Sequence, residues 1–240
     1  MKTEDIDYRD GALTMRGFLA YDETLSGKRP GVLVVHEGWG LGKNAMRRAE
    51  MLAQLGYVAF AADMYGDRRQ LSGREEMMEV IGDLLKKPAK LRQRGRAGLA
   101  TLAALPQVDV KKLGAIGFCF GGTTVLELAR DGADLAGVVS FHGGLGTEKP
   151  AVKGAVKASV LVLTGADDPM ATAAQVNTLE EEMRQAGADW QVLSYGGAMH
   201  GFTNPEADGS FSPAVLYHER TDRRSWLAMR NFFEEVFARG

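Results

Sequence analysis

Cysteine and proline are scarce in this chain, which has one cysteine, Cys119, and seven prolines among 240 residues. A single cysteine excludes an internal disulfide, which fits a reducing compartment. No stretch approaches the roughly 20 apolar residues of a membrane helix, and the polar start MKTEDIDYRDG lacks the apolar core of a signal peptide. The sequence therefore predicts a cytoplasmic protein with no membrane partner.

An excess of either charge is also missing, since 29 Lys and Arg residues stand against 31 Asp and Glu. The most basic stretch, residues 86–96 (KKPAKLRQRGR), contains no aromatic side chain that could stack on a base. We interpret this run as the solvated face of a helix, which such runs usually are. Nucleic acid is therefore not expected as a partner.

The composition is that of an average soluble globular protein, with 45% hydrophobic and 25% charged residues. The length fits one large domain, and neither an internal repeat nor a linker rich in Pro, Gly or Ser divides the chain. We therefore expect a single domain over residues 1–240, acting as a monomer or a homodimer.

Apolar runs of strand length alternate with stretches whose apolar residues lie three or four apart. The runs are nearly continuous, which indicates strands buried on both faces, as in a parallel sheet covered by helices. An antiparallel hairpin around Asp10-Gly11 is expected at the N-terminal edge. The predicted fold class is therefore α/β, a mostly parallel sheet with helices on both faces. The predicted strands are 5–8, 14–21, 32–36, 57–63, 113–118, 135–142, 159–164 and 190–195, and the predicted helices are 46–55, 91–105, 123–129, 176–186 and 221–238.

The strongest local motif is Gly117-Phe118-Cys119-Phe120-Gly121-Gly122, between a predicted strand and a predicted helix. A nucleophile on such a sharp turn needs small residues two before and two after it, which Gly117 and Gly121 provide. A thiol at a helix N-terminus also experiences the positive end of the helix dipole, which favours the thiolate. The motif predicts a nucleophilic Cys119, with the Phe120 amide pointing into the same space. The alternative is a small buried cysteine in a tight turn.

A thiol nucleophile needs a histidine base and a carboxylate that orients the base, and both follow Cys119 in the chain order typical of α/β hydrolases. His200 stands in a glycine-flanked loop after the last predicted strand. The acid is Asp168 or Asp167, and Asp168 is preferred because Pro169 follows it, as in a turn. Both loops follow the C-terminal ends of strands, where parallel sheets place their sites. The other histidines end predicted strands or lie in a long loop: His36, His142 and His218.

The segment His36-Glu37-Gly38-Trp39-Gly40 follows the strand 32–36, where an oxyanion hole takes its second amide. Gly38 lets the backbone approach closely, so its N–H is the candidate second donor beside that of Phe120. The side chain of Glu37 would project toward Cys119 or into solvent.

As a set, these residues resemble the dienelactone hydrolase family of the α/β-hydrolase superfamily. The resemblance rests on the Gly-x-Cys-x-Gly-Gly motif, the glutamate after His36, the aspartate before Pro169 and the histidine of Met199-His200-Gly201-Phe202. The resemblance spans nearly the whole chain. It implies hydrolysis of small esters or lactones through Cys119, Asp168 and His200, with Glu37 hydrogen-bonded to the resting thiol. An acyl thioester would form on Cys119 and be hydrolysed by water that His200 activates. No metal or organic cofactor is implied.

The best-known members of this family bind a substrate carboxylate with two arginines. Arg68 or Arg69 could match the first, but Asn204 stands four residues after His200, where the second is expected. This departure argues against the dienelactone itself as the substrate. The substrate-binding candidates are these two arginines and aromatic residues that would line an apolar pocket, namely Trp39, Tyr65, Phe118, Phe120 and Phe202.

Other functions compete with this interpretation. Gly38 and Gly40 after a strand suggest a dinucleotide site with Asp63, but Lys43 occupies the position of the third glycine. A hydrolase-like protein that binds ligands or senses oxidants would need the thiol but no oriented histidine. A thioesterase or carboxylesterase would share every motif. The long loop 203–218 after His200 is a candidate lid over the pocket.

Overall fold

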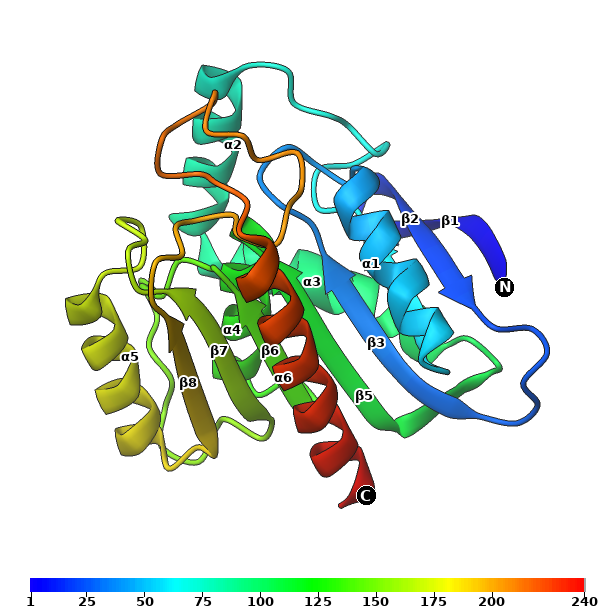
Figure 1. Cartoon of the computed structure of the whole chain (residues 1–240). Coiled ribbons are helices and arrows are strands. Elements are labelled where there is room, and N and C mark those ends of the chain that lie inside the picture. The colour runs from blue at the N-terminus through cyan, green and yellow to red at the C-terminus, as the bar shows by residue number, and fades with distance from the viewer. Residues whose placement is uncertain (240) are drawn as a thin grey trace.

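The structure is a computed structural model and describes residues 1–239. In this part of the chain, one eight-stranded sheet has the order β1-β2-β4-β3-β5-β6-β7-β8 (Figure 1). Pairing is parallel from β4 to β8, whereas β1 and β2 join antiparallel. The predicted fold class is confirmed. The elements are β1 Lys2–Asp10, β2 Leu13–Tyr21, β3 Arg29–Val35, α1 Lys43–Gln54, β4 Val58–Ala62, α2 Arg74–Leu85, α3 Pro88–Ala103, β5 Val108–Phe118, α4 Phe120–Arg130, β6 Gly137–Phe141, β7 Ser159–Gly165, α5 Ala173–Ala186, β8 Trp190–Tyr195 and α6 Glu219–Ala238.

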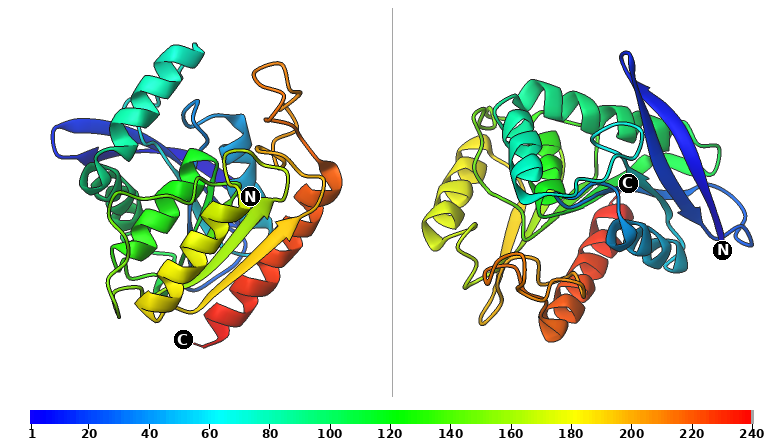
Figure 2. Two further views of the ribbon diagram at one scale, coloured as in Figure 1. Left: turned by 90° about the vertical axis from the view of Figure 1, so that its left-hand side faces the viewer. Right: turned by 90° about the horizontal axis from the view of Figure 1, so that it is seen from above.

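The central strands are buried on both faces because helices cover both sides of the sheet (Figure 2). Successive strand residues point to opposite faces, so Val32 and Val34 of β3 pack in the core under α1 and α6. Leu33 and Val35 pack in the other core, with side chains of α3, α4 and α5. Within residues 1–239, no helix is both long and apolar enough to cross a bilayer.

Helix α2 has no counterpart among the predicted helices. It lies near the C-terminal ends of the parallel strands (Figure 1). Its apolar stripe is short, with Met77, Ile81 and Leu84 spaced four and three residues apart, and most other positions are polar or exposed. That spacing, with Glu75 and Glu76 in the first turn, is the signal in the sequence that could have predicted the helix.

The basic run 86–96 is helical only from Pro88 onward, as the first part of α3. Its three lysines and Arg96 are exposed, as predicted, but the prediction of a solvated face is wrong for Arg92 and Arg94, which are buried. Arg92 pairs with Glu127 of α4 across 2.7 Å, and Arg94 donates to the carbonyl of Met64 across 2.5 Å. The two guanidinium groups therefore fasten α3 to α4 and to the segment after β4.

Candidate active site

Cys119 occupies the turn between β5 and α4, at the N-terminus of the helix. Its backbone has a φ of 54° and a ψ of −116°, a conformation that costs energy for a residue with a side chain. A Cβ atom on Gly117 would lie 2.0 Å from the carbonyl oxygen of Gly121, and one on Gly121 would lie 2.1 Å from that of Val35. The turn therefore requires glycine two residues before and two after the cysteine, as the sequence predicts.

The loop after β7 and the loop after β8 bring Asp168 and His200 together. His200 Nδ1 lies 2.9 Å from Asp168 Oδ2, and both side chains are buried. Asp168 Oδ1 accepts from the amide of Met170 at 2.7 Å, which fixes the carboxylate in the turn. Asp167 is exposed, so Asp168 is the acid that the fold places beside the histidine.

The other ring nitrogen of His200 is available for chemistry. Because Nδ1 faces a carboxylate, it carries the ring proton of the neutral form, which leaves a lone pair on Nε2. Nε2 is buried and has no hydrogen-bond partner within residues 1–239. Burial alone would lower the pKa of His200, but negative charge on Cys119 and the hydrogen bond to Asp168 outweigh it and raise the pKa above 6.5. The site therefore stabilises the imidazolium that forms when Nε2 takes up a proton.

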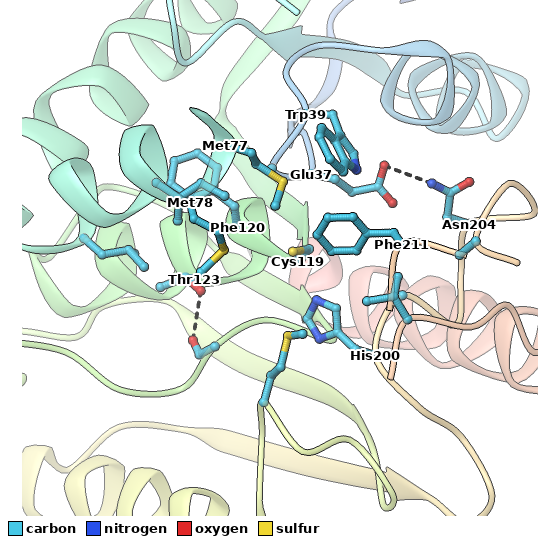
Figure 3. A pocket seen from close by; sticks show the side chains of 18 residues that line it. Glu37, Trp39, Met77, Met78, Cys119, Phe120, Thr123, His200, Asn204 and Phe211 are labelled. Carbon is cyan, nitrogen blue, oxygen red and sulfur yellow. Dashed lines mark hydrogen bonds between the residues drawn. The ribbon is translucent and has the colours of Figure 1, made fainter. Parts of the chain in front are cut away.

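Cys119 and His200 line one cavity of about 230 Å³ (Figure 3). Its walls are mostly apolar, and two segments without a sequence motif provide a large part of them. Helix α2 provides Met77, Met78, Ile81 and Leu85, and the loop after His200 provides Asn204, Ala207, Phe211 and Val215. The sequence analysis missed the first group because it missed the helix.

The carboxylate of Glu37 also reaches this cavity, but two asparagines hold it. Asn44 of α1 donates to Oε1 at 3.2 Å. Asn204 donates to Oε2 at 3.3 Å, the bond that Figure 3 shows. The implied hydrogen bond between Glu37 and the resting thiol is therefore not made in this structure. Burial raises the pKa of Glu37, and the two amides oppose that shift only in part.

The raised pKa of Glu37 makes stability depend on pH in a definite direction. The folded chain binds this proton more tightly than the unfolded chain, so the stabilisation is complete below pH 4.5 and is lost as the pH rises through the folded pKa. Glu37→Gln removes the ionisation. In urea titrations, the unfolding free energy of the variant minus that of the parent is expected to be more positive at pH 8 than at pH 4. The variant is therefore relatively more stable at pH 8. Glu79→Gln, at an exposed position of α2, is the control, and a difference that is constant with pH would contradict the prediction.

The two candidate oxyanion donors lie at the cavity wall. Gly38 and Phe120 both line it, and neither backbone N–H donates to an acceptor within residues 1–239. A Cβ atom on Gly38 would lie 2.6 Å from Ile81 Cδ1 and 2.9 Å from Met77 Sδ. The absence of a side chain at position 38 therefore lets α2 close over the cavity.

The model of the dienelactone hydrolase family matches residues 15–237. The chain belongs to this family. A solved structure named "m3DLH" is 44% identical to it, with a TM-score of 0.94 and 98% of each chain covered. A dienelactone hydrolase-like promiscuous phosphotriesterase, P91, from metagenomic libraries is 43% identical, with a TM-score of 0.93 and 98% of each chain covered. A Yersinia pestis protein named "Putative carboxymethylenebutenolidase" is 27% identical over 91% of this chain and 82% of its own. The chain is a carboxylic ester hydrolase of the α/β-hydrolase superfamily.

Neither candidate arginine of this chain lies in the cavity. Arg68 pairs with Asp5 of β1 at 2.6 Å, and Arg69 pairs with Glu76 of α2 at 2.5 Å. Neither arginine lines this cavity, because Asp5, 63 residues from Arg68, and Glu76, seven residues from Arg69, pair with the two guanidinium groups. No lysine or arginine lines the cavity among the described residues.

The aromatic candidates divide between the cavity and the core. Trp39 and Phe120 line the cavity, and the Trp39 ring packs edge-on against Phe211, with centroids 5.1 Å apart. The remaining aromatic candidates do not line this cavity. Tyr65 instead donates its hydroxyl to the carbonyl of Gly38 at 2.9 Å, whereas Phe118 and Phe202 are completely buried in the core.

Two of the other histidines have structural partners that explain them. His36 Nε2 accepts from the amide of Met64 at 3.2 Å, and His36 Nδ1 donates to the carbonyl of Glu37 at 2.6 Å, which fixes the turn before Gly38. His218 caps α6 by accepting from the amide of Thr221. Within residues 1–239, no three His, Cys, Asp or Glu side chains are grouped as metal ligands.

Proposed function

We propose that this family member hydrolyses small neutral esters or lactones with Cys119 as nucleophile, His200 as base and Asp168 as its orienting acid. The observation that carries the proposal is the cavity into which Cys119 and His200 open together, with Asp168 2.9 Å from the far nitrogen of the imidazole. A redox sensor would need the reactive thiol alone, so the oriented His200–Asp168 pair favours acyl transfer.

The first half of the reaction forms a thioester. His200 Nε2 takes the thiol proton, and the sulfur attacks the carbonyl carbon of the substrate. The amides of Phe120 and Gly38 stabilise the oxyanion, for which their unpaired N–H groups are suited. The tetrahedral intermediate collapses, the C–O bond breaks, and the leaving alkoxide takes the proton from the imidazolium.

The second half returns the thiol. His200 removes a proton from a water molecule, and the resulting hydroxide attacks the thioester carbonyl. The C–S bond breaks, the acid leaves, and the thiolate recovers its proton from His200. Asp168 stays ionised throughout and keeps the Nδ1 proton of the ring pointing away from the substrate.

The charge of the cavity selects the substrate class. Apart from the proposed base His200, the described lining residues include one acidic side chain, Glu37, and neither lysine nor arginine. A carboxylate on the substrate would lose its water without gaining a partner, which costs about 3–5 kcal/mol when a buried charge lacks its counterion. Neutral acyl groups with apolar surface instead contact Met77, Ile81 and Phe211.

A matched pair of substrates tests this proposal. p-Nitrophenyl butyrate and p-nitrophenyl hemisuccinate carry four-carbon acyl groups and share a leaving group, but only the second has a carboxylate. We expect kcat/KM to be at least about 100-fold higher for the butyrate, with a butyryl adduct on Cys119 detected by intact mass. Equal rates, or a preference for the hemisuccinate, would refute the neutral substrate class. Absence of both turnover and adduct would refute the catalytic proposal.

A second candidate activity is cleavage of neutral phosphate triesters. It is favoured by the 43% identity, over 98% of the chain, to the promiscuous phosphotriesterase P91 and by the mostly apolar walls of the cavity. Diethyl p-nitrophenyl phosphate belongs in the same panel, and we expect it to be cleaved more slowly than the butyrate. No release of p-nitrophenol from it would remove this candidate.

A further inference from the structure

His142 is a buried histidine that the proposed triad does not use. It follows β6 with a φ of 40°, and none of its surface is exposed. The backbone N–H of Cys119 is shared between the carbonyl of Phe141 at 3.0 Å and Nδ1 of His142 at 3.1 Å, so the ring proton of His142 sits on Nε2. Nε2 in turn donates to the hydroxyl of Thr203 at 2.7 Å. One imidazole therefore contacts the nucleophile turn on one side and the loop of His200 on the other.

The far end of this contact is itself anchored. Thr203 is completely buried three residues after His200, and its carbonyl accepts from Arg48 of α1 at 2.6 Å. Arg48 also pairs with Asp222 of α6 at 2.5 Å. Both oxygens of Thr203 are thus held, so the end of the His200 loop is fixed relative to the helices on that face of the sheet.

Charges around the ring keep it neutral. The rings of His142 and His200 are packed edge to face with centroids 5.2 Å apart, and Arg48 adds a second positive charge nearby. Burial, with these two groups, lowers the pKa of His142 well below 6.5. Asp222 faces Arg48 and offsets part of its charge. A neutral ring keeps one acceptor and one donor, which is what its two partners require.

We propose that His142 is a positioning residue that ties the Cys119 amide to the His200 loop through Thr203 and so sets the distance between the sulfur and Nε2. The strained backbone of Cys119 makes this tether useful, because a turn with a φ of 54° relaxes unless its neighbours hold it. A displacement of about 1 Å between reacting groups can cost about 100-fold in rate. The inference rests on the proposed function, in which these two side chains exchange a proton.

Thr203→Val tests the tether, because it removes the hydroxyl while keeping the shape and the backbone carbonyl bound to Arg48. We expect kcat for p-nitrophenyl butyrate to fall about 10-fold with KM within about twofold of the parent. Alkylation of Cys119 by iodoacetamide should slow at pH 7, and its pH profile should shift upward, because the imidazolium is less well placed beside the sulfur. Thr203→Ser restores the hydroxyl and should recover both readouts.

Thr101→Val is the matched control, since it removes a threonine hydroxyl that donates to Ala97 at 2.9 Å within α3. His142→Asn is the second variant: asparagine tolerates a positive φ and can still accept from Cys119, but it cannot reach Thr203. We expect the double variant to lose no more than either single variant, as for two ends of one interaction. Additive losses, an equal loss in Thr101→Val, or parental kinetics and alkylation in Thr203→Val would overturn the tether.

This design distinguishes a failure of the proposed function from a failure of the proposed tether. The alkylation profile needs no ester, so a shifted profile in Thr203→Val without ester hydrolysis by the parent would support the tether and reject the proposed activity. Hydrolysis by the parent with an unshifted profile in Thr203→Val would reject the tether alone. Circular dichroism and thermal unfolding establish that each variant is folded before it is compared.

Discussion

Cys119→Ala is expected to lower kcat for p-nitrophenyl butyrate by about 10⁴-fold or more, because removal of a nucleophile leaves only binding and the oxyanion donors. The acyl adduct should vanish from the intact-mass spectrum. Alanine carries the same Cβ as cysteine, so it meets the φ of 54° at this turn with no new strain and should unfold at the parent's temperature.

Cys119→Ser separates the thiol from its position. The hydroxyl occupies the place of the sulfur but is a weaker nucleophile than a thiol, so slow turnover through an oxygen ester is expected. Turnover by Cys119→Ala at a rate near that of the parent would show that the reaction does not pass through this residue, and a water-mediated mechanism would replace the one proposed.

Asp168→Asn has the second largest expected effect, a fall in kcat of about 10³–10⁴-fold. The asparagine amide would face His200 Nδ1 with a donor, which favours the tautomer whose Nε2 carries a proton and cannot accept one from the thiol. The expected loss is in kcat rather than KM, because Asp168 does not line the cavity.

Asp167→Asn is a close control, one residue away with the same chemical change. Asp167 is exposed and contacts the fold through its backbone N–H, which donates to Ala198. Its substitution should leave kcat within about twofold of the parent. A larger loss in Asp167→Asn than in Asp168→Asn would exchange the roles of the two residues.

The sheet and the turn at Cys119 could be predicted from the sequence because local rules determine them. Continuous apolar runs identify strands buried on both faces, and the spacing of Gly117 and Gly121 around Cys119 follows from backbone contacts that leave no space for a Cβ. Asp168 could be preferred over Asp167 because Pro169 marks the turn that buries one of the two.

The cavity walls could not be read in the same way, because they depend on partners far apart in the chain. Arg68 turns toward Asp5 of β1, 63 residues away, so its charge is already paired outside the cavity. The carboxylate of Glu37 is held by Asn204 across 167 residues. The family pattern implied the thiol as its partner, and only the folded arrangement of the two loops shows the asparagine there.

The contacts of Gly38 show that the cavity wall over it and the proposed reacting groups belong to different elements, which suits enzyme engineering. The proposed reacting groups stand on the rigid edge of the sheet, where turns are packed backbone against backbone. The surface above Gly38 is formed by the ends of Met77 and Ile81, on a helix whose outer side is exposed. A combinatorial library at positions 77, 78, 81 and 85 would therefore resize the cavity while the reaction centre keeps its geometry. Substitutions in α2 should therefore change the accepted substrates more readily than substitutions in the turns that hold Cys119 and His200.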